Sequence, residues 1–448
     1  MKNKQKFLSL AKALRLASIP PPHVAFVGAG GKTTAMFNVA HDLAPCIVTT
    51  TTHLGIWQAE LADQHIIIHK EEDLNQLKRI AFSGIILVTG EAKNKRLCSL
   101  PDKSLTWLKD FSSYHSLPLL IEADGARQKS LKAPKEYEPL IPDFIDAVIT
   151  VAGLSGIGKC LNNKTIYNAE EFSKLAKIKE GEKITPKAII KVLLHEKGGL
   201  KNIPLKARKI TLLTQANTSE LKATSRKITR SLLPKFDAVI TYENSRPQNF
   251  ESSSAIILAG GKSSRFGEES KQLLDYQGKS FIRTVAEKAI QANLSPVIVV
   301  TGAEHEKIKS AIEGIDVEII HNPEWEEGQS SSIRAGIKAL PKNTGSAIFL
   351  LADQPQVTPT IMRALAEEHS RTLHPVIAPM VEDRRANPVL FDRITFPALL
   401  KLKGDIGGRG IFSNFSPKYI LWLDSALLLD VDSPEDYENL LKTHKNID

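Results

Sequence analysis

Two glycine-rich stretches of the chain combine backbone amides with cationic side chains, which is the chemistry of phosphate binding. In the second half, the apolar run 255–259 leads into Gly260 and Gly261. Glycine permits backbone conformations and close approaches that a side chain would block, and successive N–H groups in such a loop can bind phosphate oxygens. Arg265 and Lys271 follow and add cationic donors for the same anion. The alternative is an ordinary strand and turn with surface charges.

The other stretch lies near the N-terminus, where the apolar run 23–27 precedes Gly-Ala-Gly-Gly-Lys-Thr-Thr and a helix-compatible run, 35–43. This order is typical of a phosphate-binding loop, in which amides and the helix N-terminus hold the phosphates, the lysine neutralises them and a threonine reaches Mg²⁺. The match is imperfect, because the full pattern has glycine where Phe26 stands. The predicted phosphate loop consists of Gly28, Gly30, Gly31, Lys32, Thr33 and Thr34.

Carboxylates stand at or just beyond the ends of apolar runs in both halves. Glu122 and Asp124 end one such run, in the manner of the acidic strand that pairs with a phosphate loop and holds its metal. Asp353 ends another, and Asp430 and Asp432 lie near the C-terminus. A buried carboxylate is costly unless it is paired or metal-bound, and Mg²⁺ uses such groups together with substrate phosphates. For Asp432 the alternative is a helix-capping role.

Three further polar stretches are candidates for ligand contact. Thr49-Thr-Thr-Thr-His53 follows an apolar run, which suits a polar crevice at a strand end or a solvated turn. Gln329 opens a segment rich in serine, in which Ser330 or Ser331 can cap a helix or offer polar groups to a ligand. The loop 403–409 contains Asp405 and Arg409 as ligand contacts.

The elements that must position these residues form an α/β protein. The length of 448 residues suggests two or three domains, and the 42% hydrophobic and 24% charged residues are ordinary for a globular protein. Apolar strands alternate with helical segments, which predicts two doubly wound, mainly parallel-sheet domains. Three widely spaced cysteines, no apolar secretory core and no bilayer-length run favour a reducing cytoplasm and no membrane.

Charge is distributed unevenly and marks a domain boundary. Residues 1–250 hold 37 Lys and Arg against 23 Asp and Glu, whereas the remainder holds 22 against 27. The cations are scattered and carry no nucleic-acid motif, so a phosphate-rich small ligand or an acidic protein partner is expected and nucleic acid is not. Together with this change in charge, the polar stretch 243–254 predicts a domain boundary near residue 250. The predicted domains are 1–248 and 252–448.

The N-terminal motifs together resemble one family over most of residues 20–245. Gly-Ala-Gly-Gly-Lys-Thr-Thr, Thr-Thr-Thr-Thr-His, Glu-Ala-Asp-Gly-Ala-Arg and Lys-Ala-Pro occur in the order found in the YqeC-like selenium-dependent hydroxylase accessory proteins. These are phosphate-loop proteins found alongside molybdenum hydroxylases that need selenium. The resemblance implies a P-loop-like domain with ATP or GTP as its ligand, and it implies no particular reaction.

The C-terminal motifs, over residues 254–440, resemble the molybdenum cofactor cytidylyltransferases, a MobA/MocA-like branch of the nucleotidyltransferases. That family has a single doubly wound, Rossmann-like domain and joins CMP from CTP to molybdopterin–molybdenum, releasing pyrophosphate. The resemblance implies these roles: catalytic Arg265, Lys271 and Asp353; nucleotide-binding Leu258, Ala259, Gly260, Gly261, Gln329, Ser330 and Ser331; pterin-binding Asp405 and Arg409; and Mg²⁺-binding Asp353, Asp430 and Asp432.

One motif departs from the cytidylyl pattern. Leu-Ala-Gly-Gly, beginning at Leu258, is more like the guanylyltransferases, whereas Gly-Gln-Ser-Ser-Ser, Asp-Gln-Pro and Asp-Val-Asp-Ser-Pro-Glu-Asp favour the cytidylyl branch. We therefore expect CTP, with GTP open. A sugar-phosphate nucleotidyltransferase and a non-enzymatic carrier that delivers the finished cofactor to a client molybdenum hydroxylase are the competing hypotheses.

Overall fold

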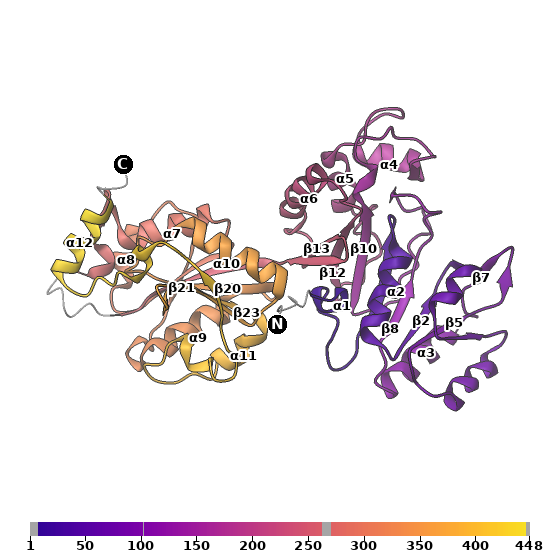
Figure 1. Cartoon of the computed structure of the whole chain (residues 1–448), viewed down its shortest axis with the longest axis horizontal. Coiled ribbons are helices and arrows are strands. Elements are labelled where there is room, and N and C mark those ends of the chain that lie inside the picture. The colour runs from indigo at the N-terminus through magenta and orange to yellow at the C-terminus, as the bar shows by residue number, and fades with distance from the viewer. Residues whose placement is uncertain (1–7, 102, 262–269, 445–448) are drawn as a thin grey trace. The chain divides into compact units, whose positions relative to one another are not determined.

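The computed structural model describes residues 8–101, 103–261 and 270–444, and Arg265 lies outside these ranges. The chain divides into two compact units between Phe250 and Glu251 (Figure 1). No helix in the described ranges is long and apolar enough to cross a membrane. We call the part up to Phe250 unit 1 and the remainder unit 2.

Unit 1 is built on a nine-stranded sheet in the order β14-β13-β12-β10-β1-β8-β2-β5-β4, in which only the edge strand β14 is antiparallel. Its inner strands are predominantly apolar and almost wholly buried, as expected for parallel strands covered on both faces. The strands are β1 (His23–Gly28), β2 (Cys46–Thr50), β4 (Gln64–Ile67), β5 (Ile85–Thr89), β8 (Leu119–Glu122), β10 (Ala147–Gly153), β12 (Arg208–Thr214), β13 (Ala238–Glu243) and β14 (Arg246–Phe250).

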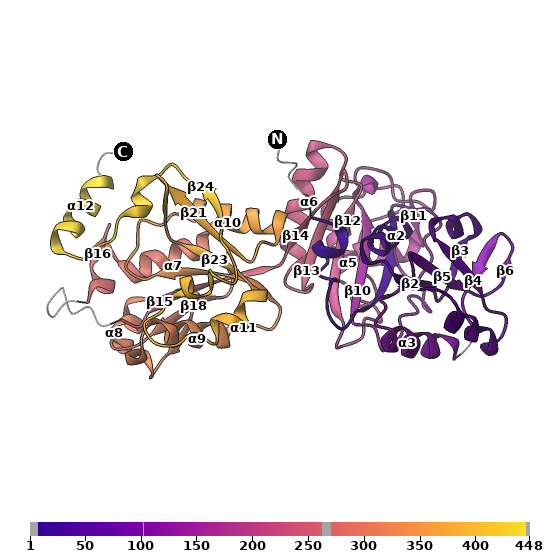
Figure 2. The same ribbon diagram turned by 60° about the horizontal axis from the view of Figure 1, so that its bottom comes forward.

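Helices cover both faces of this sheet, with α2 and α3 on opposite sides (Figure 2). They are α1 (Leu10–Ala13), α2 (Lys32–Leu43), α3 (Ser104–Tyr114), α4 (Ala169–Ala176), α5 (Pro186–Leu194) and α6 (Ser219–Leu232). Local sequence sets several of their starts: the Thr185 and Thr218 side chains cap α5 and α6. Unit 1 also contains two small sheets. One has three strands, β3 (His53–Gly55), β7 (Arg96–Cys98) and β6 (Ala92–Lys93), and the other has two, β9 (Leu131–Lys132) and β11 (Ile166–Tyr167).

Unit 2 has a mixed sheet in the order β19-β18-β15-β20-β23-β21-β22, with β24 beside β21. The strands β19, β18, β15 and β20 are parallel, whereas β23 is antiparallel to both of its neighbours. The strands are β15 (Ser252–Ala259), β18 (Val297–Thr301), β19 (Glu318–His321), β20 (Thr344–Leu351), β21 (Val376–Val381), β22 (Arg384–Arg385), β23 (Val389–Asp392) and β24 (Lys418–Leu421), with the small hairpin β16 (Asp275–Tyr276), β17 (Lys279–Ser280).

The core of unit 2 lies on both faces of β15, because successive strand side chains point to opposite faces. Ala255 and Ile257 pack with α7 and α10, whereas Ile256 packs with α9 and α11. The helices are α7 (Phe281–Gln291), α8 (His305–Ala311), α9 (Gln329–Ala339), α10 (Pro359–Thr372), α11 (Phe396–Leu399) and α12 (Pro434–His444). The predicted fold class, two doubly wound α/β domains with mainly parallel sheets, is confirmed.

The polar stretch 243–254, which was predicted to mark the domain boundary, contains regular strands. Residues 246–250 form β14, which pairs with β13, and β15 begins at Ser252. The polar residues on either side of the division thus belong to strands of the two units, because backbone pairing does not require apolar side chains. Asn249, for example, is buried and donates its amide to the carbonyl of Ala13 (2.6 Å).

Candidate functional site

The main cavity of unit 1 lies at the carboxyl ends of its parallel strands. The strand β1 lies between β8 and β10, so the loop after β1 meets the acidic end of β8 at one edge of the sheet. A cavity of about 1060 Å³ opens there, lined by residues that follow β1, β2, β8 and β12. This is the position at which doubly wound sheets bind ligands.

The glycines after β1 are required by the backbone. Gly28, Gly30 and Gly31 have φ values of 95°, 92° and 103°, in the left-handed region that favours glycine. A Cβ on Gly28 would lie 2.2 Å from the carbonyl oxygen of Val151, and one on Gly30 would lie 2.3 Å from the Gly153 nitrogen. The loop thus packs against the end of β10, with no space for a side chain at either position.

The amides of this loop are largely bound to protein acceptors. Gly28 N–H donates to the Asp124 carboxylate, Ala29 N–H to the Val151 carbonyl and Gly30 N–H to the Lys129 carbonyl, each at 2.9 Å. In this structure these three amides are therefore engaged within the protein, and phosphate binding by the loop stays a prediction. The N-terminus of α2, which begins at Lys32 after the N-cap Gly31, remains as the anion-binding element.

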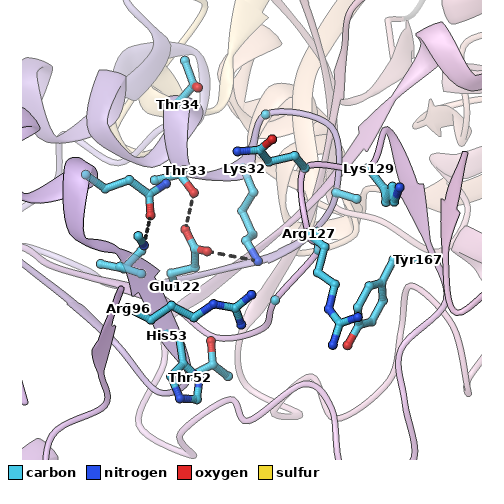
Figure 3. A pocket seen from close by; sticks show the side chains of 18 of the residues that line it. Lys32, Thr33, Thr34, Thr52, His53, Arg96, Glu122, Arg127, Lys129 and Tyr167 are labelled. Atoms are coloured by element: carbon cyan, nitrogen blue, oxygen red, sulfur yellow. Dashed lines mark hydrogen bonds and ion pairs between the residues drawn. The ribbon is translucent and has the colours of Figure 1, made fainter. Parts of the chain in front are cut away.

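Lys32 is buried with two carboxylates from the end of β8. Its ammonium group donates to the Asp124 carboxylate and backbone carbonyl and lies 3.4 Å from a Glu122 oxygen. The Thr33 hydroxyl donates to the other Glu122 oxygen (2.6 Å), so Glu122 joins the lysine and the threonine (Figure 3). The structure thus brings together the predicted loop and acidic residues, while Thr34 lines the cavity beside them.

Lys132 and Glu138 extend this charge cluster. The Lys132 ammonium donates to Asp124 (2.8 Å), to the Gly125 carbonyl (2.7 Å) and to Glu138 (2.9 Å). Lys132 begins the Lys-Ala-Pro motif, whereas the sequence gave no sign of Glu138, because that residue follows an irregular turn with no periodicity. The cluster contains two cations and three carboxylates, all nearly excluded from solvent.

These contacts decide the charge states in the cluster. Burial alone would lower the pKa of Lys32, but Asp124 and Glu122 outweigh it and raise the pKa above its ordinary value. Burial alone would raise the pKa of Asp124, but Lys32 and Lys132 hold it below its ordinary value. Burial raises the pKa of Glu122, only partly opposed by Lys32 and Thr33. Lys32 and Asp124 are therefore charged at neutral pH, and Glu122 is the carboxyl that protonates more readily.

The oxygen donors of unit 1 would suit a magnesium ion. The Thr33 hydroxyl and the Glu122 carboxylate lie side by side on the cavity wall, and Mg²⁺ prefers such hard oxygen ligands. Within the described ranges, no group of three or more His, Cys, Asp or Glu residues could hold a metal alone. The remaining ligands would therefore come from phosphate and water.

In unit 2, Lys271 joins two of the predicted metal carboxylates. Its ammonium lies 2.8 Å from Asp353, after β20, and 3.1 Å from Asp432, before α12. Burial would lower the pKa of Lys271, but Asp353 and then Asp432 raise it. The third carboxylate, Asp430, accepts a hydrogen bond from the Gln354 amide (2.9 Å). Two hard carboxylates around one cation fit a Mg²⁺ site whose other ligands are substrate phosphates.

Asp432 is not a helix cap. Ser433 takes that position: its hydroxyl accepts from the Asp436 N–H (3.2 Å), while the Asp436 carboxylate accepts from the Ser433 N–H (2.8 Å). This reciprocal arrangement is a capping box. The Asp432 side chain is thus left to face Lys271, as the metal-site interpretation requires.

A cavity of unit 2, about 340 Å³, contains four other predicted residues in its lining. Leu258, Gln329, Asp405 and Arg409 all line it. Asp405 also accepts a hydrogen bond from the Gln329 N–H (3.2 Å), which joins the two loops. Lys271, Asp353 and Asp432 are not among the residues that line this cavity, and the intervening segment 262–269 lies outside the described ranges.

The remaining predicted residues are buried or lie beside the loop. Ala259 and Gly260 are buried and Gly261 is exposed. Ser330 and Ser331 are buried inside α9, whose N-cap is Gly328, so the capping prediction was wrong. Their hydroxyls are engaged within the protein: Ser331 donates to the Gly328 carbonyl (2.9 Å), and Ser330 accepts from Arg334 (3.2 Å). Their backbone N–H groups are also engaged, with the carbonyls of Gly404 (3.3 Å) and Gly328 (3.1 Å).

Comparison with known proteins assigns each unit. Residues 24–170 match the family model described as YqeC protein, and residues 255–418 match the model described as MobA-like NTP transferase domain. The chain is 25% identical to the uncharacterized protein YqeC of Escherichia coli, covering 45% of this chain and 78% of that protein.

Two further curated relatives are similar to part of the chain. Nicotine blue oxidoreductase of Paenarthrobacter nicotinovorans is 28% identical, covering 42% of this chain and 95% of that protein. The molybdenum cofactor cytidylyltransferase of Escherichia coli is 26% identical, covering 41% of this chain and 92% of that protein. The chain is a fusion of a YqeC domain with a nucleotidyltransferase domain of the MobA-like NTP transferase family.

Proposed function

We propose that unit 2 transfers CMP from CTP to the terminal phosphate of molybdopterin–molybdenum and releases pyrophosphate. The observation that carries this proposal is the pair Asp353 and Asp432, which lie far apart in sequence and meet around Lys271. The likeness to a molybdenum cofactor cytidylyltransferase supports the choice of substrate. Because the other relative is named as an oxidoreductase, the substrate has to be tested directly, by measuring whether turnover depends on the pterin.

The chemistry needs no protein nucleophile, because the substrate phosphate is itself the attacking group. Asp353 and Asp432 would hold Mg²⁺, which when bound supplies positive charge for the triphosphate and the departing pyrophosphate. Lys271 would release the carboxylates to the metal and contribute its own charge to the phosphates. Arg409 and Asp405, on the cavity that also contains Leu258, would contact the pterin substrate.

For unit 1 we propose a nucleotide-binding accessory role, with ATP or GTP bound at the N-terminus of α2. Lys32 and Thr33 begin that helix, and Glu122 lies beside both. A phosphate would compete with Asp124 for the Lys32 ammonium, so nucleotide binding is expected to reorganise the buried cluster. The fusion raises the effective concentration of each unit for the other, which favours a shared pathway in maturing a selenium-dependent molybdenum hydroxylase in the cytoplasm.

Pyrophosphate release by the full chain tests the assignment of unit 2. The assay supplies Mg²⁺ and molybdopterin–molybdenum and compares CTP, GTP and ATP, with Asp353→Ala as the inactive variant. Asp316→Ala, which changes an exposed aspartate elsewhere in unit 2, is the matched control. Release with CTP that is lost only in Asp353→Ala supports the proposal.

The other outcomes are equally informative. Release with GTP alone would mean that the guanylyl-like motif at Leu258, a residue of the same cavity as Arg409, predicts the nucleotide better than the other motifs do. Turnover that does not depend on the pterin would indicate a sugar-phosphate or other acceptor. Absence of release with all three nucleotides would contradict the enzyme assignment and favour the cofactor carrier.

A further inference from the structure

The cavity of unit 1 extends well beyond the nucleotide end. Besides the loop and the start of α2, its lining includes the hairpin β6–β7, the segment 125–129 after β8 and Tyr167 of β11. Six lysines and arginines but only two glutamates line it: Lys32, Lys95, Arg96, Arg127, Lys129, Lys135, Glu122 and Glu138. The excess of positive charge is therefore a property of the whole cavity, and a large part of it lies away from the helix N-terminus.

The cations at the mouth differ from the buried ones in how they are paired. Lys32 is held by carboxylates, as described above. For Arg96, Arg127 and Lys135, by contrast, no ion pair with a described carboxylate is present. The two glutamates of the lining could pair with these cations only by giving up their present contacts. Glu122 is bound to Lys32 and Thr33, and Glu138 is bound to Lys132. Like charges gathered around one cavity attract an anion from solution.

Two turns hold the arginines in place. Asn94 and Lys95 have φ values of 50° and 59°, as in a two-residue hairpin turn, and this turn sets Arg96 at the start of β7. Arg127 and Gln128 have φ values of 47° and 58°, and consecutive non-glycine residues in this region cost conformational energy. Figure 3 shows the Arg96 and Arg127 side chains on opposite sides of the space next to Glu122 and Lys32.

Tyr167 makes one wall of the same space. Its ring lies 6.0 Å from the Arg127 guanidinium carbon and 5.6 Å from the Lys135 ammonium. A cation over an aromatic face keeps its charge but loses conformational freedom. The two cations are thus partly preorganised, whereas solvated surface cations would not be. Guanidinium groups suit planar or tetrahedral oxyanions, because two parallel N–H groups can donate to two oxygens.

We propose that unit 1 has a second anion subsite, formed by Arg96 of the hairpin β6–β7 and Arg127 of the segment after β8, which binds a phosphate or carboxylate group of a second ligand beside the nucleotide. This inference rests on the proposed nucleotide binding in one respect: the subsite lies beside the nucleotide only if the nucleotide binds at Lys32. The cavity is then a two-ligand site, and the YqeC domain has a substrate or effector besides its nucleotide.

Hydrogen–deuterium exchange of the full chain tests this subsite, because it reports each segment separately. Three ligand conditions are compared: a nonhydrolysable ATP analogue with Mg²⁺, the same with inorganic phosphate, and the same with malonate. Each anion is also added alone. The variants are Arg96→Ala and Arg127→Ala, and the matched control is Lys93→Ala, on the same hairpin but outside the cavity lining.

We expect the added anion to protect residues 92–98 and 125–129 in the wild type and in Lys93→Ala. Each arginine variant should weaken the apparent affinity at least about tenfold, since a charge-assisted hydrogen bond is lost. Protection by phosphate alone identifies a phosphorylated ligand, and protection by malonate as well identifies a carboxylate. Protection that is absent, or that persists unchanged in both arginine variants, overturns the subsite. Failure of the nucleotide to protect residues 31–38 would instead contradict the proposed nucleotide binding.

Discussion

Replacement of Lys132 by methionine should destabilise unit 1 more than any single surface change. Methionine retains the unbranched aliphatic part of the side chain but removes the ammonium group. That group makes three contacts of 2.7–2.9 Å with Asp124, Gly125 and Glu138, and its side chain is 3% exposed. The substitution therefore removes one cation from a buried cluster and leaves the packing nearly intact.

The expected loss in the free energy of unfolding is about 3–5 kcal/mol, the usual cost of leaving a buried charge without its partner. Most of this loss would come from the carboxylate of Glu138, which would be left buried without a cationic partner. Its carboxylate is 6% exposed, and without Lys132 its remaining partners among the described residues are the Lys135 N–H (3.3 Å) and, through a long bond, the Tyr167 hydroxyl (3.4 Å). Asp124 would be affected less, because Lys32 and the Gly28 N–H still bind it.

Native-state hydrogen exchange of amides in β1, β8 and β10 measures this loss in the full chain, because it reports the opening of unit 1 without requiring two-state unfolding of both units. Lys174→Met is the matched control. Lys174 forms an exposed pair with Glu170, so its loss should cost less than about 1 kcal/mol. The double variant Lys132→Met with Glu138→Gln should recover most of the stability, because both charges are then gone.

A loss of less than about 1 kcal/mol in Lys132→Met would refute the reasoning, because it would mean that Glu138 is hydrated or neutral in the native protein. A double variant no more stable than the single one would also contradict it. In that case the ammonium would contribute mainly through the Gly125 carbonyl rather than through the carboxylate.

Three further outcomes follow from the buried groups. Burial raises the pKa of Glu122, so the native state prefers its protonated form and wild-type stability falls as pH rises through the native pKa. Glu122→Gln should lack this fall, measured by exchange between pH 4 and 8, and should weaken Mg²⁺-dependent nucleotide binding at least about tenfold. Burial lowers the pKa of Lys288 to about 8, so unit 2 should gain stability from pH 8 towards 10, and Lys288→Met should remove the gain; an unchanged pH profile would contradict this. Gln356 donates to the Leu429 carbonyl (2.7 Å), and Gln356→Leu should cost about 1–3 kcal/mol and raise the KM for Mg²⁺ by displacing Asp432; an unaltered KM would show that the contact does not position the carboxylate.

The inner strands could be predicted because the signal is local and strong. A run such as Ile-Ile-Leu-Val-Thr in β5 is apolar at every position, which identifies a strand covered on both faces. Glycine loops after β1 and β15 and the carboxylates after β8 and β20 were recognisable for the same reason. The strand β14 was missed, because Arg-Pro-Gln-Asn-Phe has no apolar pattern and its position depends on pairing with β13.

By itself, the sequence determined the two domain families, the order of the phosphate-loop and carboxylate motifs and the fold class, because these depend on residue types at short spacing. The tertiary structure alone decided which charges meet. It paired Lys32, at the start of α2, with Glu122 and Asp124 at and just beyond the end of β8, and it set Lys271 between two distant aspartates.

The tertiary structure also decided how the glycine loop is used. The N–H of Gly28 donates to Asp124, 96 residues later in the chain, and those of Ala29 and Gly30 donate to the carbonyls of Val151 and Lys129. Likewise, Arg96 and Arg127 line one cavity only because the hairpin β6–β7 and the loop after β8 meet at the carboxyl edge of the sheet. Contacts between segments so far apart arise from packing and backbone pairing across the whole unit, which no local pattern of residue types encodes.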